Sequence, residues 1–136
     1  MVALSLQKKI KTISVIRKSR IFSANWLNYR SPEQRKYALD LARPGNGEDK
    51  LSLMEVPYFL DSDTPVLDQA EAIMLCRVSR ILECGDHDLI VAKVSRARAS
   101  GDFFPKRYWE FKKYKPMVYL GSTMDDPLST IAGRSS

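Results

Sequence analysis

The sequence predicts a mainly β protein, a small β-barrel with short helices inserted between its strands. Two apolar runs, residues 78–84 and 89–94, flank a polar turn at residues 85–88, which is the pattern of a β-hairpin. Another strand-like run opens the chain at residues 2–6. One short helix-rich excursion among several strands favours a single β-barrel with inserted helices.

The elements of the first third follow from local patterns. Ile13 and Ile16 lie three apart in residues 13–19, as on one face of a short helix. Residues 21–27 then alternate in polarity like a strand.

A second helix is expected to begin at Ser31. Ser31 suits the N-cap, Pro32 suits the first turn, and Gln34 completes a capping box. Tyr37 would open its apolar face, and the helix would end before the turn-forming residues 43–47.

The middle of the chain leads to the hairpin. We expect a helical turn at residues 49–54, a strand at 56–60, a turn at 61–65 and a long strand at 72–84.

Length and composition describe an ordinary globular protein. The chain has 136 residues, 44% of them hydrophobic and 28% charged, which suits one soluble domain. A final strand at residues 116–121 would close a domain of residues 1–121, and residues 122–136 would form a loosely held tail. No window offers the roughly 20 apolar residues of a membrane span, and the start does not read as a secretory signal. We therefore expect a cytoplasmic protein that does not enter a membrane.

Charge and cysteines indicate partners and compartment. The net charge of +6 and the pI near 9.4 favour anionic partners, or reflect an ordinary solvated basic surface. Cys76 and Cys84 lie eight positions apart on one expected strand, roughly 26 Å, which is beyond disulfide reach. Both are expected to be reduced, buried thiols without a catalytic role.

His87 is the only histidine and lies in the expected turn. The residues alone leave three interpretations open: a hydrogen-bonded turn histidine, a metal ligand between Asp86 and Asp88, or a polar group facing a bound nucleotide. The metal reading lacks the further nitrogen or sulfur ligands that zinc and iron sites need, so no metal is expected. Gly85 would allow a positive φ, and Asp86 would fix the ring tautomer.

Two basic segments are candidate binding sites. Lys8, Lys9, Lys11 and Thr12 would cradle a phosphate together with the following helix N-terminus, or would form a basic loop in water. Residues 102–115 interleave aromatic and cationic side chains, as in proteins that bind single-stranded nucleic acid. A segment that covers a barrel end or a dimer seam is the preferred reading, so nucleic acid is not the expected partner.

Two stretches resemble the flavin reductase-like, FMN-binding split-barrel family. Residues 78–91 carry Val-Ser-Arg-Ile and Gly-Asp-His-Asp-Leu-Ile-Val, similar to the family's signature hairpin. Phe22, Asn25 and Leu27 match its Phe-x-x-Asn-x-Leu strand. The resemblance covers residues 2–121 and has two departures. The family's earlier strands and Thr-Ala-Ser-like loop are missing, as in an N-terminally shortened split barrel. Its Gly-Glu-Val is replaced by Ala-Lys-Val at residues 92–94.

The resemblance implies a function. It implies a homodimer that binds FMN at the subunit interface, takes a hydride from NADH or NADPH, and passes reduced flavin or electrons to a partner oxygenase or other acceptor. A non-catalytic flavin-binding protein or a purely structural dimer is the alternative.

The resemblance also implies roles for single residues. Lys9, Lys11 and Thr12 would contact the flavin phosphate, and Asn25 would lie near the ring. His87 would act at the nicotinamide face as the catalytic residue, with Gly85 and Asp86 beside it in the cofactor site.

Overall fold

The computed structural model describes residues 1–42, 55–101 and 115. The chain forms two compact units. The first contains Met1–Asn25, Phe59–Val66 and Ile73–Arg98. The second contains the described residues of Trp26–Tyr58, Leu67–Ala72 and Ala99–Ser136.

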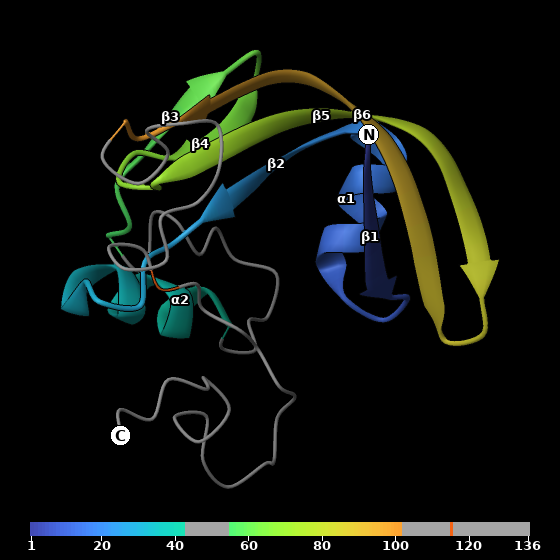
Figure 1. Ribbon diagram of the computed structural model, residues 1–136. Helices are drawn as coiled ribbons and strands as arrows, with labels where there is room; N and C mark the ends of the chain where they lie inside the picture. Colours follow the sequence, from blue (N-terminus) through green and yellow to red (C-terminus); the bar gives the residue numbers. More distant parts are fainter. Residues whose placement is uncertain (43–54, 102–114, 116–136) are drawn as a thin grey trace, which may run out of the picture. The chain divides into compact units, whose positions relative to one another are not determined.

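A four-stranded sheet dominates the described residues (Figure 1). Its strand order is β1-β6-β5-β2, and β1 pairs antiparallel with β6 from Val2 opposite Ala92 to Gln7 opposite His87. β5 and β6 form a long hairpin that curls strongly (Figure 1). A two-stranded sheet joins β3 and β4. The strands are β1 (Val2–Gln7), β2 (Ile21–Trp26), β3 (Tyr58–Asp61), β4 (Thr64–Leu67), β5 (Ala72–Cys84) and β6 (His87–Ala99).

The core of the first unit forms where α1 (Lys11–Ser19) packs on this sheet. Ile13 and Ile16 are 2% and 4% exposed and contact Val78 and Ile90. The three-residue spacing of the isoleucines therefore forms the buried helix face that the sequence predicts.

The residues of β5 that face the core of the first unit do not follow a strict alternation. Val78 and Ile81 both pack into this core although they are three positions apart. Regular alternation would put them on opposite faces, so the alternation along β5 is interrupted between these two residues.

α2 (Pro32–Ala42) belongs to the second unit. Of the two hydrogen bonds of the predicted capping box, it has the one made by Ser31. The Ser31 hydroxyl accepts the backbone N–H of Gln34 at 3.2 Å. The prediction that the Gln34 side chain completes a capping box is wrong. The Gln34 side chain instead accepts the N–H of Asn28 at 2.6 Å and donates to Glu71 at 2.9 Å. Tyr37 joins the small core of this unit.

The mainly β fold class with inserted short helices is confirmed. Besides shifts of one or two residues at the ends of other elements, four details differ. The turn predicted at residues 61–65 is only Ser62 and Asp63, both at positive φ, because β4 already begins at Thr64. The turn predicted at 85–88 is shorter for the same reason, since β6 begins at His87. β6 also continues past residue 94 to Ala99 because its pairing with β5 continues.

The fourth difference concerns the thiols. Cys76 is buried but Cys84 is exposed, at the end of β5, and both are free. The predicted elements at residues 49–54 and 116–121, the tail at 122–136 and most of the aromatic segment at 102–115 lie outside the described residues. None of the described helices is both long and apolar enough to cross a bilayer.

Candidate functional site

The turn of the β5–β6 hairpin lies directly beside the lysine-rich segment. The backbone N–H of Lys8 donates to the carbonyl of Asp86 at 2.9 Å, and Gln7 pairs with His87. Gly85 has φ +60° with open space around its Cα, a conformation that glycine adopts without strain. We call residues 85–87 the hairpin corner.

His87 contacts its neighbour Asp86 in this corner. Its Nδ1 lies 2.8 Å from Asp86 Oδ1, and the two side chains are 42% and 78% exposed. This hydrogen bond, reinforced by the charge attraction, lowers the pKa of Asp86 below its usual value. The described residues contain no group of three His, Cys, Asp or Glu side chains that would hold a metal ion.

Alternation along β6 separates His87 from the helix. Asp88, Ile90 and Ala92 are fully buried, and Ile90 packs against α1. His87 is out of phase with them, so its side chain projects from the sheet face opposite α1.

The three predicted phosphate-binding residues lie where the chain enters α1. Lys9 is exposed in the preceding turn, and Lys11 and Thr12 are the first two residues of the helix. The N-cap residue, Ile10, makes no side-chain hydrogen bond to the backbone N–H groups of this first turn.

Asn25 lies far from the corner within one chain. Its Nδ2 donates to Ser23 Oγ at 2.9 Å on β2. β2 pairs with the first half of β5: the Val78 N–H donates to the Arg20 carbonyl. The corner follows the other end of β5, a strand of 13 residues, or about 40 Å when fully extended. The structure therefore brings the basic segment and the corner together but leaves Asn25 apart from them.

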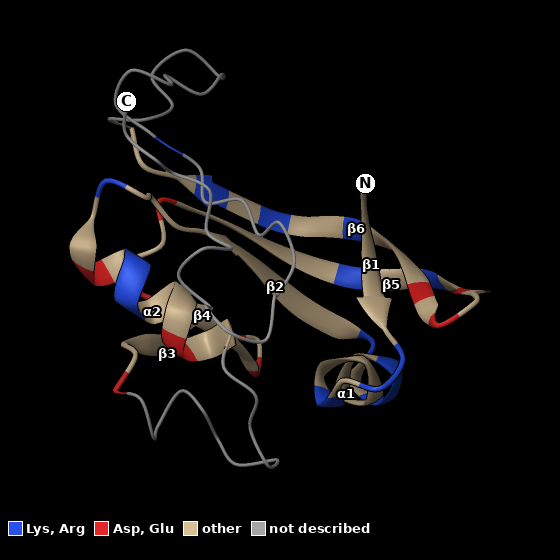
Figure 2. Cartoon of the chain, turned by 90° about the horizontal axis from the view of Figure 1, so that it is seen from below, with Lys and Arg blue, Asp and Glu red and all other residues tan. Residues whose placement is uncertain are grey.

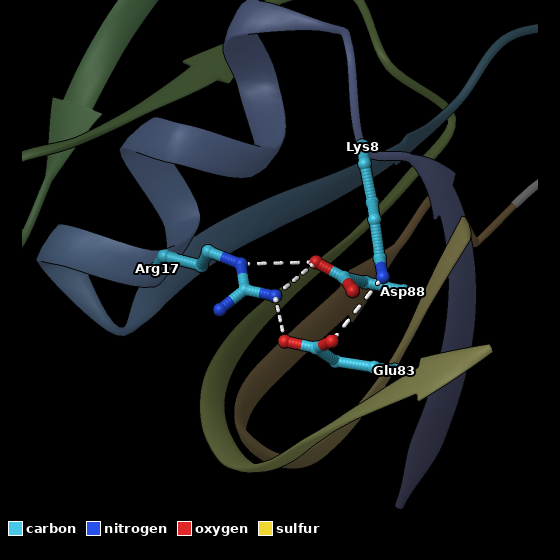
Figure 3. Close-up of polar contacts among 4 residues, drawn as sticks. All are labelled: Lys8, Arg17, Glu83 and Asp88. Atoms are coloured by element: carbon cyan, nitrogen blue, oxygen red, sulfur yellow. Dashed lines mark hydrogen bonds and ion pairs between the residues drawn. The ribbon is translucent and has the colours of Figure 1, made fainter. Parts of the chain in front are cut away.

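An ion cluster that the sequence analysis missed joins α1 to the hairpin (Figure 3). Arg17 Nε and Nη2 donate to Asp88 Oδ2 at 2.9 and 2.7 Å. Arg17 Nη2 also lies 3.6 Å from Glu83, and Lys8 Nζ lies 3.3 Å from the other oxygen of Glu83. Figure 2 marks basic residues on α1 and on the loop before it, and acidic residues at the hairpin end.

A separate pocket of about 190 Å³ opens elsewhere in the first unit. Two arginines, Arg77 and Arg96, contribute to its lining, together with three hydroxyl residues, Ser62, Thr64 and Ser95. Arg96 is held by Asp61, with Nη1 2.9 and 2.7 Å from the two carboxylate oxygens. The residues predicted for the site from sequence do not line this pocket.

The sequence resembles known reductase proteins over most of its length. Residues 1–126 match the family model of the flavin reductase like domain. The chain is 31% identical over 133 residues to the reductase component of a 4-nitrophenol 4-monooxygenase/4-nitrocatechol 2-monooxygenase from Rhodococcus opacus. That match covers 95% of this chain and 68% of the relative.

Solved structures share the fold at low identity. Flavoredoxin from Methanosarcina acetivorans has a TM-score of 0.69 at 18% identity, covering 93% of this chain and 74% of that one. An FMN-binding protein from Thermus thermophilus has a TM-score of 0.66 at 24% identity, covering 76% and 57%. An NADH:FAD oxidoreductase from Streptomyces globisporus has a TM-score of 0.66 at 21% identity, covering 85% and 61%.

The chain thus spans 57% and 61% of the last two structures. The structural likeness supports the split-barrel fold, and the family model matches nearly the whole sequence. The protein belongs to the flavin reductase-like family.

Proposed function

We propose that this protein is a cytoplasmic NAD(P)H:flavin oxidoreductase that binds FMN and supplies reduced flavin, or electrons, to a partner oxygenase or another acceptor. The observation that carries the proposal is the family match over residues 1–126. The Rhodococcus opacus relative supports an oxygenase partner because it is a monooxygenase reductase component. The Thermus thermophilus neighbour is an FMN-binding protein, and the Streptomyces globisporus neighbour is an NADH:FAD oxidoreductase.

In the proposed site, Lys9, Lys11 and Thr12 bind the flavin phosphate. The start of α1 supports this assignment, because its N-cap residue offers no side-chain cap and helix N-terminal N–H groups attract phosphate. The net charge of +6 adds a general attraction for a dianionic ligand.

His87 is the proposed catalytic residue at the nicotinamide face, and Asp86 orients its ring. The 2.8 Å contact between Nδ1 and the Asp86 carboxylate favours the tautomer with the proton on Nδ1. Gly85 provides the positive φ that turns the corner. When bound, the flavin accepts the hydride, and the protein supplies binding, orientation and electrostatics.

A homodimer completes this site. In one chain, Asn25 lies on β2 beside the first half of β5, whereas His87 follows the other end of that strand. In the proposed dimer, Asn25 of one copy and the hairpin corner of the other approach the same flavin.

Steady-state oxidation of NADH and NADPH, with and without added FMN, tests the proposal. We expect FMN-dependent oxidation with either nucleotide and a flavin absorbance band on the purified or FMN-loaded protein. Flavin binding without oxidation would favour the non-catalytic flavoprotein. A protein that neither binds flavin nor oxidises either nucleotide would refute the proposal and leave a structural dimer.

The role of His87 has a separate test. His87→Ala is expected to slow flavin reduction by about 10²-fold, the contribution typical of a positioned catalytic side chain, with the thermal transition unchanged. Because His87 is 42% exposed, its removal leaves no buried cavity. An unchanged reduction rate would remove His87 from the mechanism.

A further inference from the structure

We propose that Arg17 and Asp88 form a clamp that sets α1 against the start of β6 and holds Lys11 and Thr12 in place for the flavin phosphate. Both are positioning residues rather than ligands of the flavin. The inference rests on the proposed function and assigns a role to side chains outside the hairpin signature.

The bonds of the clamp fix direction as well as distance. Arg17 donates through Nε and Nη2 to the single oxygen Oδ2 of Asp88, at 2.9 and 2.7 Å (Figure 3). A planar guanidinium that makes two charge-assisted bonds has little freedom to rotate. The Asp88 side chain is 0% exposed, so its anchor point lies in the packed interior.

Apolar packing alone does not provide this alignment. Ile13 and Ile16 hold α1 to the sheet, but hydrophobic contact is non-directional and leaves the helix free to turn or slide slightly. Asp88 Oδ1 is buried and has no hydrogen-bond partner among the described residues. An apolar side chain at position 88 would avoid this desolvation, so the gain from the carboxylate is a fixed geometry.

A second anchor holds the entry to the helix. Lys8 bonds the hairpin twice, through its backbone N–H to Asp86 at 2.9 Å and through Nζ to Glu83 at 3.3 Å. Arg17 reaches the same Glu83 at 3.6 Å. The proposed phosphate segment, residues 9–12, therefore lies between two attachments to one hairpin.

The test separates positioning from stability with an apolar double variant, Arg17→Met with Asp88→Leu. It removes both charges together, so no buried charge is left alone and we expect a thermal transition at or above that of the wild type. We expect the Kd for FMN to rise about tenfold or more, because small misplacements of binding groups are costly. The Kd for riboflavin, which lacks the phosphate, and kcat at saturating FMN should stay unchanged.

Two further variants complete the design. Arg17→Lys keeps the charge but loses the two-bond geometry, so it should also weaken FMN binding even if the double variant fails to fold. Asp61→Leu with Arg96→Met is the matched control: it removes a 2.7 Å ion pair of the same unit and should leave the Kd for FMN unchanged.

Each outcome decides the proposal. A folded double variant, or Arg17→Lys, with the wild-type Kd for FMN would overturn the clamp. If the wild-type protein binds no FMN, the proposed function fails first, and amide hydrogen exchange of residues 8–12 then tests the clamp alone. Faster exchange in the double variant than in the control would support it, and equal exchange would overturn it.

Discussion

Asp88 is a charged side chain in a position that would suit an apolar one. It is fully buried, and only one of its two oxygens is hydrogen-bonded among the described residues. Its partner Arg17 is 44% exposed. Water can therefore solvate Arg17 when Asp88 is removed, but it cannot solvate Asp88 when Arg17 is removed. This asymmetry predicts unequal effects of the two single substitutions.

Arg17→Met is expected to destabilise the protein more than Asp88→Leu. The first leaves the Asp88 carboxylate buried without a counter-charge, which costs about 3 kcal/mol of unfolding free energy. The second leaves a guanidinium that water solvates, so the change should stay within about 1 kcal/mol. Urea denaturation of both variants measures the difference. A larger loss from Asp88→Leu would mean that the carboxylate itself, rather than its pairing, stabilises the fold.

The two cysteines differ in the same way, by exposure. Cys76 is 2% exposed, and burial raises the pKa of its thiol, whereas Cys84 is exposed. Because the thiolate is the reacting form, a raised pKa and burial both slow Cys76 at neutral pH.

We therefore expect iodoacetamide to modify Cys84 of the native protein and to leave Cys76 unmodified until urea unfolds the chain. Peptide mass spectrometry after timed labelling measures both sites in one sample. Equal labelling of the native thiols would contradict the burial of Cys76 on β5.

At the scale of elements, α2 depends on one local bond at its start. The Ser31 hydroxyl accepts the Gln34 N–H at 3.2 Å, so Ser31→Ala should lower the unfolding free energy by about 1 kcal/mol. Ser31→Asp should restore it. Ser14→Ala is the control, because the exposed Ser14 hydroxyl donates to the Lys11 carbonyl within α1 rather than capping a helix end. Equal midpoints for the Ser31 and Ser14 variants in urea would rule out the cap as a source of stability.

Elements set by neighbours in sequence were predictable, and those set by distant partners were not. The Ser31 cap and the Ile13–Ile16 face need only four residues of context. Asp88 lies in a polar cluster that resembles a solvated turn, and its partner Arg17 is 71 positions away. The sequence therefore gave no signal for its burial. β6 likewise runs on through Arg96 because pairing with β5, rather than local propensity, sets its length.

The candidate site divides in the same manner. The sequence correctly predicts the hairpin and the strand before the lysine-rich segment from their apolar runs, and the structure puts Lys8 against Asp86. The resemblance to the family offered no means of seeing that Asn25 and His87 lie toward opposite ends of β5 in one chain. Strand pairing between β2 and β5 decides that distance, and a linear motif does not encode it.

At the scale of the whole molecule, the net charge of +6 bears on which flavin the protein prefers. FMN carries a phosphate dianion and riboflavin is neutral, so only FMN gains from the basic segment before and within α1. Salt screens such attraction, with a Debye length of about 10 Å at 0.1 M and about 3 Å at 1 M.

We expect the Kd for FMN to rise several-fold between about 0.05 and about 0.5 M NaCl, while the weaker Kd for riboflavin stays constant. Fluorescence titration of each flavin against the full chain measures both. The double variant Lys9→Gln with Lys11→Gln should bring the affinity and salt response of FMN closer to those of riboflavin, because it removes two of the three proposed side-chain contacts to the phosphate. Lys93→Gln is the control, because it also lowers the net charge but changes a residue of β6 that is not part of the basic segment. It should change the FMN affinity only slightly. If the two flavins bind equally at all salt concentrations, the protein reads the ring alone, and the phosphate site at α1 is wrong even where flavin reduction is observed.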